Sequence, residues 1–190
     1  MVMQDKNAGE TGRLAGLEAL LKSCAERGEA PIEKWSPPYC GDIGLSISAD
    51  GQWHYRGSPI GRKRLVKLFS RVLWREPDGN HYLVTPAEKV DIAVADAPFL
   101  AVEMDVQGEG QERAIIFRTN VDDAVAVGPE HPLRFATEPE SGGVKPYVLV
   151  RGQLEALVVR SLTYDLLELA EEDDKGQTGL YAGGAFFPID

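Results

Sequence analysis

The sequence gathers many of its cations in one short stretch that contains no acid. Between His54 and Arg75 it holds seven basic side chains, namely Arg56, Arg62, Lys63, Arg64, Lys67, Arg71 and Arg75. An arginine ends in a planar fork of N–H donors that matches the oxygens of a phosphate or a carboxylate. The stretch therefore favours docking of an anionic ligand or partner. The alternative is a solvated helix face that pairs with acids elsewhere in the fold.

The same stretch predicts an amphipathic helix over residues 61–73. Its apolar stripe consists of Leu65, Leu68, Phe69 and Val72. The cations at i, i+3, i+7 and i+11 would form one ridge of that helix, and they are Arg64, Lys67, Arg71 and Arg75. Arg62 stands at the predicted helix start, where unpaired backbone N–H groups also favour anions. We therefore expect Arg62 and Arg64 to contact the ligand.

A second polar string, residues 85–89, lies between two predicted strands. Thr85 and Glu88 have the spacing of a capping box, but the alternation from Val90 to Val94 is typical of a strand. A turn between strands is therefore the better interpretation. We hypothesise that Thr85, Glu88 and Lys89 contact a ligand at the seam between two structural units. The alternative is turn chemistry with a surface ion pair.

A third group of polar residues spans 118–131. Arg118 and Asn120 precede the neighbouring carboxylates of Asp122 and Asp123. Such residues often shape a turn, and two adjacent carboxylates could instead bind a hard cation. Because no spaced set of further oxygen ligands follows, we predict no metal site. His131 lies in a Glu-His-Pro loop, which makes it a candidate ligand contact or a histidine that satisfies backbone groups.

Composition limits the classes of protein to which the chain can belong. It has 190 residues, of which 43% are hydrophobic and 26% charged, and a formal net charge of −10. These values are typical of a globular protein and argue against a bulk nucleic-acid binder. The first twelve residues lack the basic and apolar regions of a signal peptide, and no apolar run is long enough to span a membrane. We expect a cytoplasmic protein with no membrane association.

Periodicity predicts an α+β fold with antiparallel sheets. Helical spacing predicts helices over residues 14–28, 61–73 and 152–170. Two-residue turns at Asp50-Gly51 and Asp78-Gly79 predict hairpins, and glycines at 108–110 and 142–143 predict two more. A last hairpin is expected at 180–188. Residues 121–127 could be a short helix or a short strand.

The order of the predicted elements occurs twice. In each half a hairpin is followed by an amphipathic helix and then by another hairpin. We therefore predict an N-terminal helix and connector over residues 1–38, a first β–helix–β unit over 39–89 and a second over 90–190. Ligand sites often lie between such related units.

From Tyr39 onward the chain resembles the bacterial family of unknown function DUF1285. The resemblance rests on these strings: Cys40-Gly41-Asp42-Ile43, Trp53-His54-Tyr55-Arg56-Gly57-Ser58-Pro59-Ile60, Leu83-Val84-Thr85-Pro86-Ala87-Glu88-Lys89-Val90, Asp96-Ala97-Pro98-Phe99, Arg118-Thr119-Asn120, Glu130-His131-Pro132-Leu133 and Phe186-Phe187-Pro188. Where the family usually continues the first string with an acid and a basic residue, this chain has Gly44 and Ser46.

The resemblance implies a core made by domain duplication, with a C-terminal half that looks like the pleckstrin-homology fold. It also implies a binding site between the halves for a nucleotide-like ligand, and a role in signalling. The matching strings add Asp42 and Tyr55 to the candidate ligand contacts named above. No activity is established for the family.

Motifs for the common catalytic chemistries are missing from the sequence. It has no GxxxxGK[ST], GxGxxG after a strand, HExxH or GxSxG. We therefore predict a non-catalytic module, in signal transduction or a stress response, that binds a small anionic, nucleotide-like ligand at the interface of its two repeats. One alternative is a protein–protein adaptor that uses the C-terminal half. The other is an enzyme of unrecognised type in which Asp42, Glu88, Arg118 and His131 converge. No cofactor is identified.

Overall fold

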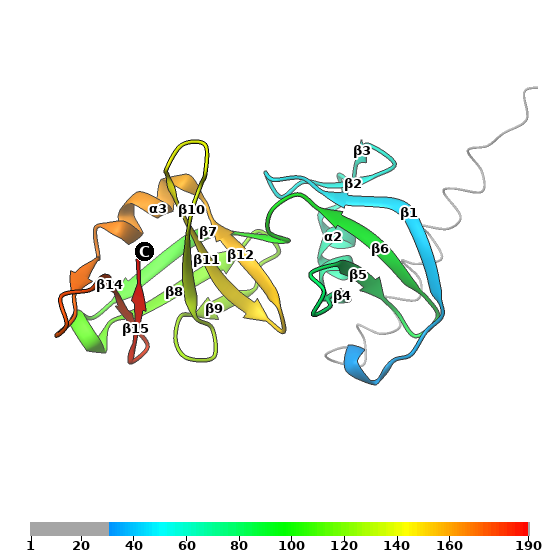
Figure 1. Ribbon diagram of the computed structural model, residues 1–190. Helices are drawn as coiled ribbons and strands as arrows, with labels where there is room; N and C mark the ends of the chain where they lie inside the picture. Colours follow the sequence, from blue (N-terminus) through cyan, green and yellow to red (C-terminus); the bar gives the residue numbers. More distant parts are fainter. Residues whose placement is uncertain (1–30, 190) are drawn as a thin grey trace, which may run out of the picture. The chain divides into compact units, whose positions relative to one another are not determined.

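The computed structural model describes residues 31–189, which its contacts divide into two units (Figure 1). Of the described residues, the first unit contains those up to Leu45 together with Trp53–Ala93. The second contains Ser46–Gln52 and the residues from Val94 onward. The helix predicted over residues 14–28 lies outside the described residues.

The first unit is a six-stranded sheet that curls around one α-helix (Figure 1). Its elements are η1 (Ile32–Lys34), β1 (Tyr39–Ile47), β2 (Trp53–Tyr55), β3 (Ser58–Pro59), α2 (Lys63–Ser70), β4 (Leu73–Arg75), β5 (His81–Val84) and β6 (Lys89–Val94). The strand order is β3-β2-β1-β6-β5-β4. Both hairpins predicted at Asp50-Gly51 and Asp78-Gly79 are confirmed.

The core of the first unit lies between this sheet and α2. Successive side chains of a strand point to opposite faces, and the alternate residues Ile43 and Leu45 of β1 are buried. Trp53 of β2 stacks on Phe69 of α2, with ring centroids 6.2 Å apart. The helix buries its apolar stripe against the sheet, which leaves its opposite face to solvent.

The second unit contains a six-stranded sheet, a helix and a small three-stranded sheet. Its elements are β7 (Phe99–Gln107), η2 (Gly110–Glu112), β8 (Ala114–Thr119), β9 (Ala124–Ala126), β10 (Leu133–Thr137), β11 (Val144–Arg151), β12 (Leu154–Val158), α3 (Arg160–Leu167), β13 (Glu171–Glu172), β14 (Thr178–Ala182) and β15 (Ala185–Pro188). The larger sheet has the order β10-β11-β12-β7-β8-β9, and the smaller one β13-β14-β15. Fully buried Phe99, Phe117, Leu166 and Leu180 belong to its core.

The two larger sheets have the same topology. In each, the first three strands lie in sequence on one side, the next three on the other, and the first strand neighbours the sixth. That central pair is parallel in the second unit, where Phe99 of β7 pairs with Ala156 of β12. It is also parallel in the first, because Lys89 N donates to Pro38 O and Ala95 N to Ile47 O at the two ends of β1 and β6. The structure thus supports an α+β fold built by duplication.

The elements that recur are not the ones predicted, because the helix expected over residues 152–170 is confirmed only at Arg160–Leu167. Leu154, Ala156 and Val158 are buried in alternation in the strand β12, and only Arg160–Leu167 form α3. Leu154 and Leu157 have helical spacing, whereas Leu154, Ala156 and Val158 have the alternation of a strand, and pairing with β11 and β7 decides for the strand. Helix α2 therefore lies between the third and fourth strands of its unit, whereas α3 follows the sixth.

The predicted ridge of four cations is also too long. Helix α2 ends at Ser70 with Arg71 as its C-cap, and the chain then enters β4 at Leu73. Arg75 therefore belongs to β4 and not to the helix. The undecided segment 121–127 contains the short strand β9.

Candidate functional site

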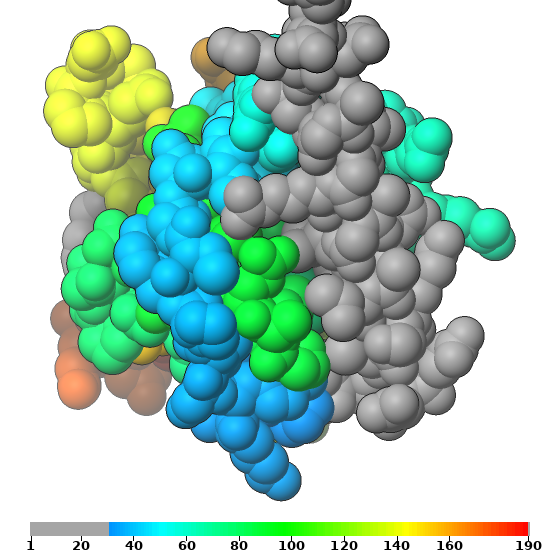
Figure 2. Space-filling view, turned by 90° about the vertical axis from the view of Figure 1, so that its right-hand side faces the viewer, coloured from blue at the N-terminus to red at the C-terminus, as the bar shows by residue number. Residues whose placement is uncertain are grey.

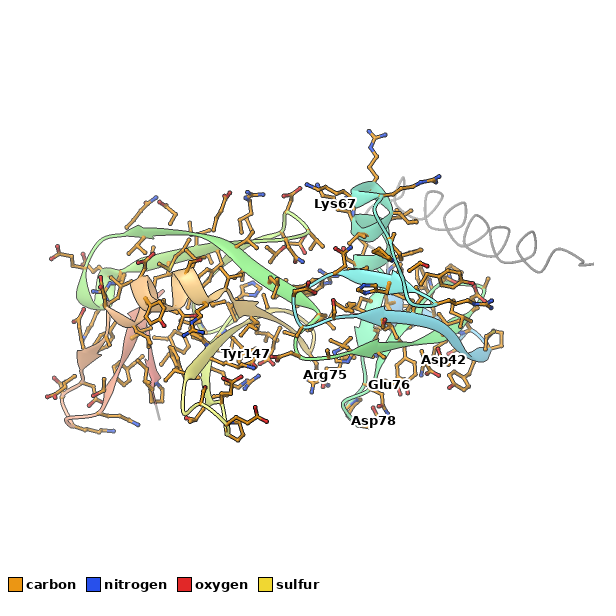
Figure 3. All side chains as sticks on the ribbon, turned by 90° about the horizontal axis from the view of Figure 1, so that it is seen from above. Asp42, Lys67, Arg75, Glu76, Asp78 and Tyr147 are labelled. Atoms are coloured by element: carbon orange, nitrogen blue, oxygen red, sulfur yellow. The ribbon has the colours of Figure 1, made fainter. Side chains whose placement is uncertain are left out.

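The outer face of α2 carries several cations close together. Lys63, Arg64 and Arg71 are exposed, and within residues 31–189 none of them forms an ion pair. Half-buried Lys67 projects from the same helix (Figure 3). In the space-filling view, turquoise side chains of the β3–α2 region protrude at the right-hand edge (Figure 2). We call Lys63, Arg64, Lys67 and Arg71 the α2 cations.

The helix itself supplies no negative charge to balance these residues. It contains no acidic side chain in the segment Lys63–Ser70, and its N-cap, Arg62, makes no capping side-chain hydrogen bond. The α2 cations thus create a positive local potential in a chain whose net charge is −10. Such a surface attracts phosphate or carboxylate groups.

A further cation, Arg56, is held by an unusual backbone contact between β1 and the β2–β3 turn. Arg56 has a left-handed backbone with φ of +48° and is followed by Gly57 at +78°. The amide of Arg56 donates to the carbonyl of Gly44 at 2.7 Å, and Gly44 itself has φ of +85°. Asp42 Oδ1 in turn accepts a hydrogen bond from the Gly44 amide at 2.7 Å. Two of the strings that carry the family resemblance therefore meet at one corner of the sheet.

This corner gives Asp42 and Tyr55 positions that the sequence alone does not reveal. Asp42, predicted as a ligand contact, fixes the backbone beneath Arg56. Tyr55 precedes Arg56, whose Cζ lies 5.4 Å from the centroid of the tyrosine ring. The Tyr55 hydroxyl is buried without a hydrogen-bond partner in the described structure. Arg56 belongs to the basic stretch noted in the sequence but not to the predicted site residues. The Arg56-Gly57 pair is a turn signal that could have pointed to it.

The string at residues 85–89 forms a turn between β5 and β6, as predicted. The buried Thr85 hydroxyl accepts hydrogen bonds from the amides of Ala87 and Glu88 and donates to the Glu88 carbonyl. Lys89 forms an ion pair with Glu76, and its Nζ lies 4.0 Å from the centroid of the Tyr82 ring. These contacts stabilise the turn and engage the Lys89 ammonium.

The predicted site residues of the second unit are likewise engaged in local contacts. Arg118 forms a two-pronged ion pair with Glu103 and a second one with Asp122 at 2.6 Å. The hydrogen bonds from Arg118 to Glu103 raise the pKa of Arg118 above its already high ordinary value. Asn120 Oδ1 accepts from the Leu100 amide at 3.0 Å, and His131 Nδ1 donates to the Leu149 carbonyl at 3.0 Å.

The ten predicted site residues thus divide between the two units. Seven lie in the first unit, namely Asp42, Tyr55, Arg62, Arg64, Thr85, Glu88 and Lys89, and three in the second, namely Arg118, Asn120 and His131. Asp42 and Tyr55 are connected indirectly, because two successive hydrogen bonds through Gly44 link Asp42 to Arg56, the residue after Tyr55.

Two further classes of site find no support in residues 31–189. No three or more His, Cys, Asp or Glu side chains in this range are placed to hold a metal ion. Neither α2 nor α3 has the length and apolar character of a membrane span, and no other described helix does.

Comparison with known proteins gives matches to family models and to solved structures. Residues 30–97 match the model of the N-terminal domain of DUF1285, a domain of unknown function, and residues 98–189 match the model of the C-terminal domain. A DUF1285 family protein from Silicibacter pomeroyi DSS-3 is 45% identical, with a TM-score of 0.83 over 92% of this chain and 94% of that one. A second, from Shewanella baltica OS155, shares the fold at 22% identity, with a TM-score of 0.52 over 66% of this chain and 91% of that one. No curated protein matches.

Proposed function

The chain belongs to the DUF1285 family, and we propose that it is a non-catalytic binding protein that recognises the phosphate groups of a nucleotide-like ligand. The proposal assigns recognition to the first unit. It places the protein in the bacterial cytoplasm, in signal transduction or a stress response.

The observation that carries the proposal concerns the charge pairing of three of the α2 cations. Lys63, Arg64 and Arg71 are exposed and have no ion-pair partner within the described residues. Cations on the second unit provide the contrast, since Arg118 is paired with Glu103, Arg134 with Glu155 and Lys145 with Asp96. An arginine already bound to a carboxylate must give up that partner to bind a phosphate, whereas Arg64 and Arg71 need not.

The enzyme alternative receives less support from the same contacts. Asp42 holds the Gly44 amide, Arg118 holds Glu103, and the Nδ1 of His131 holds a backbone carbonyl. A general acid or base must instead be within hydrogen-bond reach of a reacting group, with its own orienting partner. These side chains act as structural partners, which favours a binding role.

A protein adaptor is the second candidate, and the edges of the second unit's sheet favour it. Strands β9 and β10 lie at the two ends of the strand order. An edge strand can pair with an extended peptide of another protein through its backbone N–H and C=O groups. In this alternative the C-terminal half, which we compare with a pleckstrin-homology fold, supplies the docking surface.

A thermal-shift panel tests the proposed function directly. Nucleoside mono-, di- and triphosphates would be added to the full-length protein at about 0.05 M ionic strength, where exposed charges are weakly screened. Ligand at one hundred times its Kd stabilises the folded state by about 2.7 kcal/mol, which raises the Tm by roughly 5–10 °C. A panel in which no compound raises the Tm would contradict the proposal. Capture of a partner by β9 or β10, without any nucleotide response, would favour the adaptor.

A further inference from the structure

We propose that the Arg56–Gly57 turn is the phosphate-contacting tip of the first unit, where Arg56 donates its forked N–H groups to one phosphate of the ligand. This inference rests on the proposed function and deepens it. It names a single residue, outside helix α2, as the anchor of the site.

Arg56 has a strained backbone conformation. Tyr55 pairs with Ser58 across the hairpin, so Arg56 and Gly57 form its two-residue turn. Both have positive φ, at +48° and +78°, as in a type I′ turn. At these positions Asn, Asp and Gly are preferred, because a larger side chain is strained there. An arginine therefore occupies a position where its backbone is disfavoured.

Hydrogen bonds through Gly44 and Asp42 hold this strained residue in place. The Gly44 carbonyl accepts a hydrogen bond from the Arg56 amide at 2.7 Å, and the left-handed backbone of Gly44 turns β1 toward the hairpin. A Cβ atom on Gly44 would lie 2.8 Å from Arg56 Cγ, so only glycine leaves room for the arginine stem. Asp42 fixes Gly44 through its amide. Strained residues that the surrounding structure over-determines cluster at ligand contacts.

The side chain of Arg56 is exposed and chemically suited to an anion. Arg56 is solvent-exposed, and its stem lies against Gly44. Its guanidinium lies beside the Tyr55 ring, with Cζ 5.4 Å from the ring centroid. Contacts on both sides restrict the rotamers of a normally flexible side chain, and less conformational entropy is lost when it binds. The forked N–H donors of a guanidinium match the oxygens of a phosphate.

Substitution of Arg56 by asparagine separates a binding role from a packing role. Asparagine tolerates the left-handed backbone and removes the charge. We expect Arg56→Asn to be at least as stable as the wild type in urea. By calorimetry at low salt, its Kd for inorganic triphosphate should rise at least tenfold. Arg56→Lys keeps the charge without the fork and should fall between the two proteins.

The outcomes are distinguishable from those of the parent proposal. If Arg56→Asn binds triphosphate as the wild type does while Arg64→Glu binds it more weakly, the Arg56 assignment is wrong and the proposed function stands. If the wild type binds no triphosphate, both fall. If Arg56→Asn lowers the unfolding midpoint, Arg56→Gln, which keeps the stem over Gly44, replaces it. Wild-type affinity in Arg56→Gln would overturn the assignment.

Discussion

The amide of Arg56 donates a 2.7 Å hydrogen bond to the carbonyl of Gly44, and both residues have left-handed backbones. This contact joins β1 to the β2–β3 turn and sets the direction of an exposed guanidinium. A Cβ atom on Gly44 would lie 2.8 Å from Arg56 Cγ, so the lack of a side chain at Gly44 allows the approach of Arg56. The corner therefore explains why a glycine is suited to this position in the present chain.

Replacement of Gly44 tests how tightly this corner is built. Gly44→Ala should lower the free energy of unfolding by about 2–3 kcal/mol, because the new Cβ adds a 2.8 Å contact with Arg56 Cγ to the cost of a left-handed alanine. Gly57→Ala is the matched control, since Gly57 has a similar φ but a Cβ added there would meet no atom within 4 Å. It should cost about 1 kcal/mol. Equal losses in urea unfolding would show that the contact with Arg56 is unimportant.

A pH-dependent stability is expected from His81 at the start of β5. Burial, with a smaller contribution from nearby Arg75, lowers the pKa of His81 from 6.5 to about 4. Between these values the unfolded chain binds a proton that the folded chain does not, so the folded state loses stability as the pH falls from about 6.5 to 4. Because His81 is only half-buried, we expect this loss to be about 1–2 kcal/mol.

Urea unfolding at pH 4.5 and pH 7 measures this effect. His81→Phe should reduce the difference between the two pH values, whereas His54→Gln, which leaves His81 in place, should retain it. A wild-type difference that His81→Phe leaves unchanged would assign the effect to other groups.

An ion pair in the second unit gives a prediction about stability. Arg113 is buried, donates to the Leu169 carbonyl at 2.9 Å and pairs with Glu171. Glu171→Gln removes the partner of a buried cation and should cost about 2–3 kcal/mol. The adjacent, exposed Glu172 provides a control, and Glu172→Gln should change stability by less than about 0.5 kcal/mol. Similar midpoints for the two variants would mean that water replaces Glu171 at no cost.

Turn chemistry explains which parts of the fold could be predicted from the sequence. Asp50-Gly51 and Asp78-Gly79 specify hairpins locally, and both form. In residues 154–158 the leucines have helical spacing while Leu154, Ala156 and Val158 alternate as in a strand, and only pairing with distant β7 and with β11 decides between the two. Local pattern therefore cannot identify β12.

The candidate site likewise has features that the sequence predicts and features that only the structure reveals. The α2 cations follow from helical spacing, because the helix is amphipathic and its apolar stripe fixes which face is exposed. The role of Asp42 depends instead on the backbone of Gly44, and that of Arg56 on a hydrogen bond across twelve positions of the chain. The ion pair of Arg118 depends on the β7–β8 register, which places Glu103 opposite it. The contacts of Arg56 and Arg118 join residues that are distant in the sequence, so neither has a local sequence signature.

The most direct test of the account compares two charge reversals of equal size by calorimetric titration with inorganic triphosphate. Arg64→Glu/Arg71→Glu removes exposed cations of α2, and Lys34→Glu/Lys175→Glu makes the same change in net charge at exposed positions elsewhere. We predict that the α2 double variant raises the Kd at least tenfold and that the control stays within about threefold of the wild type. Equal weakening in both variants, or wild-type affinity in the α2 variant, would contradict recognition by this helix face.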